Sequence, residues 1–164
     1  MVDKTEQSNP PPLGKSKVMK FSANALFCED IREEKSGQYT IVGILPDSLN
    51  VQRVPAVLPK LGIYLRFHLN TASKFRTIKA TLRVPGGKDI PLAEVHQKVL
   101  AELRTNALSG GMPFAGLVYK TFFSPFGVSA AGRLEVVAEI NGADHICGAL
   151  NITPVPPEQS ENTS

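Results

Sequence analysis

Two stretches of strict two-residue alternation constrain the fold of this chain more than any other feature. In residues 61–69, and again in 77–84, apolar side chains take every second position, with mostly polar or basic ones between them. Successive side chains of a β-strand point to opposite faces, so each stretch predicts a strand with one buried face and one face in water. Such strands are typical of antiparallel sheets that cover a core on one side.

Strand signals recur along most of the chain. In residues 18–28, Phe21 and Phe27 fall on one side, whereas Ser22, Asn24 and Leu26 fall on the other. Strand composition is also found in residues 39–45, 49–54, 114–123, 134–140 and 146–152. Asn141-Gly142 is the dipeptide typical of a two-residue hairpin turn. The pattern therefore predicts seven or eight strands.

Residues 91–106 break the alternation. Leu92, Val95, Val99, Leu100 and Leu103 recur at steps of three and four, which predicts one amphipathic helix that covers an open end or edge of the sheets. Many one-sided strands with a single short helix indicate an all-β fold, a two-sheet antiparallel β-sandwich of the immunoglobulin-like or C2-like kind.

The 164 residues are enough for one domain with its own core, which we expect to span residues 18–154. Residues 1–17 hold three consecutive prolines and few large apolar groups, so we expect a flexible Pro-rich arm that either stays free or tethers a partner. Residues 155–164 are a polar tail.

Cysteine usage and the N-terminal composition bear on location. Cys28 and Cys147 both fall in strand-like runs, where a reduced thiol packs as a small apolar group, and we expect no disulfide between them. The first residues lack an apolar signal core. We therefore expect a cytoplasmic or virion-associated protein with no membrane partner.

Positive charge gathers in one part of the chain. Residues 60–104 hold nine basic and three acidic side chains, although the whole chain is only +3. If the two clearest strands are neighbours, their polar positions form a candidate nucleic-acid face, made of Tyr64, Arg66, His68, Lys79 and Arg83. The alternative is that these cations only keep a wet sheet face soluble.

The apolar loop 124–128 is a candidate protein contact. Pro125 and Phe126 precede a glycine, so Phe126 either projects to anchor a partner or tucks into the end of the sandwich.

Catalytic and metal-binding patterns are weak. The acidic segment 29–34 is interrupted by Arg32, which favours a solvated turn over a calcium site. His145 and Cys147 form a two-residue pair with no third partner nearby in the sequence, too few for zinc or for an activated thiol. We expect no cofactor, no metal and no enzymatic activity.

Several motifs resemble an uncharacterised family of small bacterial and phage-borne β proteins, a domain of unknown function. They are Ala25–Asp30, Gly37-Gln38-Tyr39, Ile41–Ile44 and Leu58–Ile63, and the resemblance covers mainly residues 20–92. The hairpin of residues 132–140 and 146–153 is similar to the last two strands of that family. The resemblance implies a compact β-sandwich with no known activity, cofactor or catalytic residue.

These observations favour a non-enzymatic interaction or accessory module that binds a protein partner or assembles with its own copies, such as a structural protein of a phage particle. The alternative is a β-sandwich that binds nucleic acid through its basic sheet face.

Overall fold

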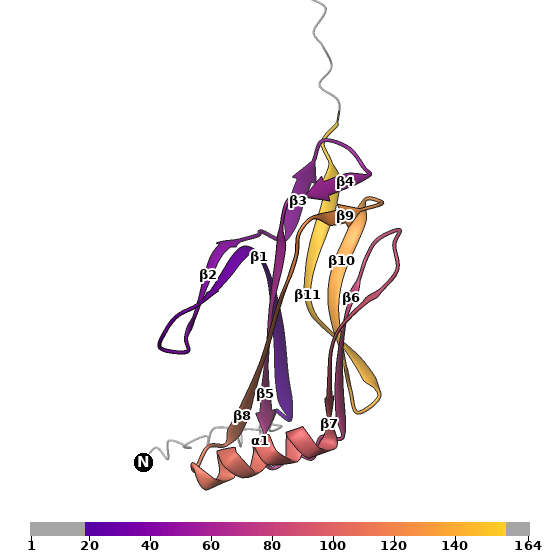
Figure 1. Cartoon of the computed structure of the whole chain (residues 1–164). Coiled ribbons are helices and arrows are strands. Elements are labelled where there is room, and N and C mark those ends of the chain that lie inside the picture. The colour runs from indigo at the N-terminus through magenta and orange to yellow at the C-terminus, as the bar shows by residue number, and fades with distance from the viewer. Residues whose placement is uncertain (1–18, 157–164) are drawn as a thin grey trace, which may run out of the picture.

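The computed structural model describes residues 19–156, so the expected arm and most of the expected tail lie outside the described residues. Within this range two sheets stack face to face, and one helix crosses an end of the stack (Figure 1). The prediction of an all-β sandwich-like fold with one short helix is confirmed.

Sheet A has four antiparallel strands in the order β2-β1-β5-β8. Their bounds are Tyr39–Ile44, Phe21–Glu33, Leu61–Asn70 and Phe114–Phe123. The first half of β1 pairs with β5, and its second half pairs with β2. The β1–β2 hairpin therefore bends out of sheet A and lies on the side of sheet A away from sheet B (Figure 1).

Sheet B has five strands in the order β3-β11-β10-β6-β7. Their bounds are Ser48–Val51, Ala143–Pro154, Gly132–Ile140, Thr77–Arg83 and Ile90–His96. Three of its four pairings are antiparallel, but β3 and β11 are parallel, so sheet B is mixed, not purely antiparallel as predicted. Two short strands, β4 (Ala56–Leu58) and β9 (Phe126–Val128), pair at the end of the sandwich opposite the helix (Figure 1).

The core fills the space between the two sheets. Sheet A contributes the inward positions of its central strands, and sheet B contributes those of β6, β10 and β11. The largest fully buried side chains include Phe67, Leu61, Ile63, Leu65, Ile78, Leu82, Leu134 and Leu150. Complete burial of such an aliphatic or aromatic side chain contributes about 1.5–3 kcal/mol, which makes this interior the main source of stability.

The predicted helix begins later than expected. Helix α1 spans Gln97–Ser109, whereas residues 90–96, including Leu92 and Val95, form strand β7 along β6. Pairing with β6 gives this segment a ladder of backbone hydrogen bonds, which outweighs its helix-like spacing. The helix packs on the end of the sandwich through Leu100, which is buried, and through Leu103 and Ala107.

Candidate functional site

The outward surface of sheet A carries large apolar side chains around a single arginine. The strand registers place Leu26 opposite Tyr64, Arg66 opposite Val118, Asn70 opposite Phe114 and Gly62 opposite Phe122. Directly opposed residues share a face, so one surface collects all of these side chains. We call this surface the sheet A outer face and define it by Leu26, Tyr64, Arg66, Phe114, Val118 and Phe122.

The apolar members of this surface are open to solvent. Leu26 is 38% exposed, Phe114 40%, Val118 36% and Phe122 38%, although all four lie in well-formed strands. Isolated exposed apolar residues are ordinary, but several on one sheet face are typical of interaction sites.

The β1–β2 hairpin borders this surface and holds its lysines in ion pairs. Lys60 lies 4.3 Å from the ring centroid of Phe122 and pairs with Asp30. The neighbouring Lys60, and then Arg32, hold the pKa of Asp30 below its ordinary value by stabilising the charged carboxylate. These charges are therefore largely satisfied within the chain.

Lys120 is similarly engaged. Its ammonium group bonds to Glu33 and lies 4.3 Å from the ring centroid of Tyr39, and the bond to Glu33 raises the pKa of Lys120. Tyr39 in turn packs edge-on against Tyr64, with the ring centroids 6.0 Å apart. The β1–β2 hairpin therefore contacts sheet A through the ring of Tyr39.

Arg66 differs from these lysines. It lies on the exposed face of β5, between Asn24 on β1 and Val118 on β8. It forms no ion pair with any acidic side chain in residues 19–156. The sheet A outer face therefore combines open apolar surface with a cation that is free to pair with an incoming anion.

An open hollow of about 470 Å³ lies at the helix end of this surface. It is lined by Met19, Ser22, Arg66, His68, Met112, Pro113, Phe114 and Gly116. Most of these lining groups are apolar or small, with Arg66 and His68 as the basic groups. A side chain from a partner would find apolar walls here with a cation beside them.

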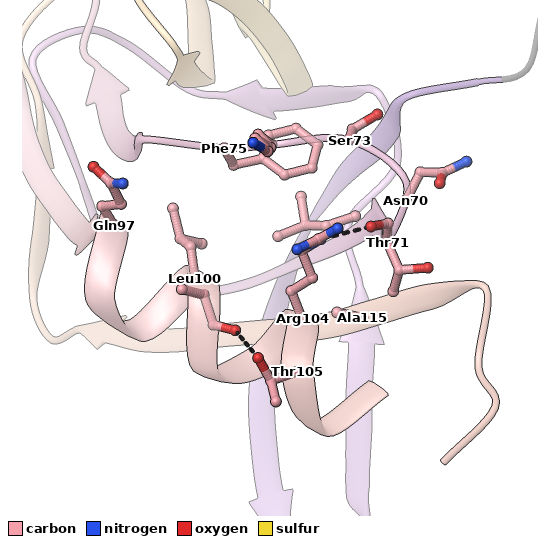
Figure 2. A pocket seen from close by; sticks show the side chains of 12 residues that line it. Asn70, Thr71, Ser73, Phe75, Gln97, Leu100, Arg104, Thr105 and Ala115 are labelled. Atoms are coloured by element: carbon pink, nitrogen blue, oxygen red, sulfur yellow. Dashed lines mark hydrogen bonds between the residues drawn. The ribbon is translucent and has the colours of Figure 1, made fainter. Parts of the chain in front are cut away.

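A second cavity, of about 260 Å³, lies between α1 and the loop that follows β5 (Figure 2). Two hydrogen bonds lie at its wall: Arg104 Nε donates to the carbonyl oxygen of Thr71 at 2.6 Å, and the Thr71 hydroxyl donates to the carbonyl oxygen of Pro113. Asn70 and Thr71 are buried and hydrogen-bonded. The hydrogen bond from Arg104 therefore anchors helix α1 to the loop that follows β5.

The outward face of sheet B is different in character. Lys79 pairs with Glu94 at 3.6 Å, Arg83 with Asp144 at 2.6 Å, and Arg133 with Glu135 at 3.1 Å. The basic side chains of this face are thus each paired with an acidic one, on the same strand or on another strand of the sheet, so the face presents little net charge.

The five-residue candidate nucleic-acid face is not brought together. Tyr64, Arg66 and His68 lie on β5 in sheet A, whereas Lys79 and Arg83 lie on β6 in sheet B. β5 pairs with β1 and β8, and β6 pairs with β10 and β7, so the expected neighbouring strands belong to opposite layers. The premise of a single basic face is wrong, because the chain crosses between the sheets in residues 71–76.

The two residues of the candidate protein-contact loop differ in their exposure to solvent. Pro125 is exposed, but Phe126 is only 4% exposed, because it pairs through β9 with β4 and packs 5.4 Å from the ring centroid of Phe123. Phe126 therefore closes the end of the core and is not a projecting anchor.

The two cysteines are free thiols in buried positions. Burial, the largest cause for each, raises the pKa of the Cys28 and Cys147 thiols and so disfavours the reactive thiolate. The His145 ring packs 4.8 Å from the ring centroid of Phe21, and Cys147 Sγ lies 3.5 Å from the backbone carbonyl oxygen of His145.

Sequence reasoning missed the apolar members of the sheet A outer face. Leu26 already stood out as an apolar residue on the polar side of its strand. The contributions of Phe114, Val118 and Phe122 required the register of β8 against β5, which no local pattern provides.

The layers and the exposed sheet face define an all-β sandwich-like protein whose outward surface is unlike that of a simple solvated sheet. The chain belongs to the Family of unknown function (DUF6941), whose family model matches residues 23–152. No curated protein matches the chain. No helix in the described part of the chain is long and apolar enough to cross a membrane.

Proposed function

We propose that this chain is a non-catalytic interaction module that binds a protein partner through the sheet A outer face. The observation that carries the proposal is the contrast between the two outward faces. Leu26, Phe114, Val118 and Phe122 are open on sheet A, whereas on sheet B the basic side chains are paired with acidic ones and one large apolar side chain, Ile146, is exposed.

The composition of the surface supports a protein ligand. Aromatic side chains and arginine are enriched in protein interfaces, and Tyr64, Phe114, Phe122 and Arg66 of this surface are of these types. A partner that inserts an apolar side chain into the hollow beside Phe114, and places a carboxylate near Arg66, would complement both features. Such a role suits a cytoplasmic accessory protein and a component of a phage particle equally.

The test compares Arg66→Glu with a charge reversal on the other outer face, at the ion-paired Arg83, in co-purification from the native host. Both arginines lie on exposed strand positions, one on each outer face. Quantitative mass spectrometry should find a protein whose enrichment with Arg66→Glu is about a tenth of the wild-type value or less. A tenfold loss of affinity corresponds to about 1.4 kcal/mol of binding free energy. The enrichment of the same protein should be unchanged with Arg83→Glu. Calorimetry with the purified pair then checks direct binding.

Two results would overturn the proposal. One is equal enrichment of every captured protein with both variants. The other is that the material retained by Arg66 is nucleic acid, recognised by nuclease sensitivity and by a steep decline with salt.

A further inference from the structure

Sheet A ends in a long strand whose outer edge lacks protection. An edge strand exposes unpaired N–H and C=O groups, and proteins usually guard it by shortness, proline, a bulge or charge. β8 has ten residues, no proline, a continuous register with β5 and one charged side chain, Lys120. That lysine is directed to Glu33 across the sheet.

The other terminal strands of the three sheets are each guarded, and β4 and β9 of the two-stranded sheet have only three residues each. β3 has only four residues. β7 contains Pro91 and shifts register against β6, and β2 has six residues with Gly43 in the left-handed region at φ 63°. Among the terminal strands of the three sheets in residues 19–156, β8 alone is long, in continuous register and free of proline.

Hydrogen bonds within the sheet identify the free backbone groups of β8. The N–H of Asn70 donates to the carbonyl oxygen of Lys20, so even-numbered residues of β5 direct their backbone polar groups toward β1. Odd-numbered residues direct theirs toward β8, as the bond from the Thr71 N–H to the Pro113 carbonyl oxygen also indicates. Since Leu65 is opposite Tyr119, the odd-numbered residues of β8 bond to β5.

The even-numbered residues of β8 then direct their N–H and C=O groups to the free edge. These residues are Phe114, Gly116, Val118, Lys120 and Phe122. β8 has no other strand neighbour within residues 19–156. The edge therefore offers alternating donors and acceptors along its whole length, as an antiparallel partner strand requires.

We propose that a second copy of this chain pairs with this edge, β8 antiparallel to β8 about a two-fold axis through Val118. This register places each Val118 opposite itself, Phe114 opposite Phe122 of the other copy, and Gly116 opposite Lys120 of the other copy. Aromatic side chains are thus paired and each lysine faces a glycine, so like charges are not opposed. Gly116 has room for this, because nothing lies within 4 Å of its Cβ position.

The pairing joins two four-stranded sheets into one of eight strands. On the inward side it sets Leu117 opposite Tyr119 of the other copy, and both are only partly buried in the single chain. This inference goes beyond the proposed function, because it concerns the backbone edge of β8 and needs no partner of a different kind.

Val118→Pro tests the pairing without cutting the β5–β8 ladder. Proline removes the edge N–H of residue 118, which β5 does not use, and proline is tolerated in edge strands for this reason. Val118→Thr is the matched control, because it keeps the N–H, the β-branching and the exposed position. Val118→Lys is a second disrupting variant that opposes two ammonium groups at the axis.

Light scattering on the full chain, from micromolar to millimolar concentration, should give wild type and Val118→Thr a mass of twice 17.7 kDa. Val118→Pro and Val118→Lys should raise the dissociation constant about tenfold or more, with an unchanged circular dichroism spectrum. Amide exchange should show concentration-dependent protection at Gly116, Val118 and Lys120.

A wild-type chain that remains monomeric over this range, or a Val118→Pro protein that dimerises as tightly as wild type, would overturn the inference. A monomer that still binds a different protein through Arg66 would overturn the edge pairing alone. A dimer whose partner enrichment ignores Arg66 would overturn the proposed function alone.

Discussion

Gly148 in β11 lies so close to Ala25 in β1 that a Cβ atom on the glycine would be 2.4 Å from the carbonyl oxygen of Ala25. The two sheets therefore approach each other at this point through bare backbone. We expect Gly148→Ala to lower the free energy of unfolding by about 1–3 kcal/mol, because one strand must shift to admit the methyl group. Urea denaturation measures the change.

The matched control for this substitution is Gly127→Ala. Gly127 lies in β9 with nothing within 4 Å of its Cβ position, so the change in stability should stay within about 0.5–1 kcal/mol. Equal stability losses in the two variants would show that the sheets do not meet closely at Gly148.

Arg104 should stabilise the docking of helix α1. Its Nε donates to the carbonyl oxygen of Thr71, a residue that is only 6% exposed, so its removal leaves a buried acceptor without its partner (Figure 2). We expect Arg104→Met to cost about 1–2 kcal/mol in thermal or urea unfolding. Lys98→Met on the same helix is the control, and a loss as large as that of Arg104→Met would contradict this role.

Asp30 should make the stability depend on pH. Its pKa is lowered from the ordinary value of 3.8, chiefly by Lys60, so its contribution is fully present above that value and is lost as the pH falls through the lower folded pKa. Wild type should therefore be slightly more stable than Asp30→Asn at pH 7, and the difference should vanish in acid. Urea unfolding at both pH values measures it, with Asp89→Asn, an exposed aspartate, as the control. A gap between wild type and Asp30→Asn that widens in acid would be the contrary result.

Both thiols should react slowly in the folded protein. Burial raises the pKa of Cys28 and Cys147, so little thiolate is present near neutral pH. A colorimetric disulfide reagent should modify two thiols per chain rapidly only after denaturation. Rapid reaction of Cys147 in the native protein would instead revive a role for it beside His145.

Much of the architecture follows from local pattern. Alternation located β5, β6, β10 and β11 because each has one face on the core. Asn141 and Gly142 adopt positive φ angles of 52° and 85°, as the hairpin dipeptide predicted.

Other features depend on contacts between distant segments. Leu92 and Val95 are three residues apart, a spacing that is also typical of a helix. They are strand residues because their segment pairs with β6. Alternation also tells which side chains of β5 and β6 face outward without telling which sheet each strand joins. That choice separated Arg66 from Lys79 and Arg83, and it created an apolar face in place of a basic one.

The proposed function requires that a partner protein binds on the sheet A outer face. A photo-crosslinking amino acid at Asn24, exposed beside Arg66 and away from the β8 edge, tests it most directly when compared with the same group at Thr81 on the outward face of sheet B. In the native host, we expect a defined adduct with a different protein from position 24 and none from position 81. No protein adduct from position 24, or the same adducts from both positions, would contradict the account.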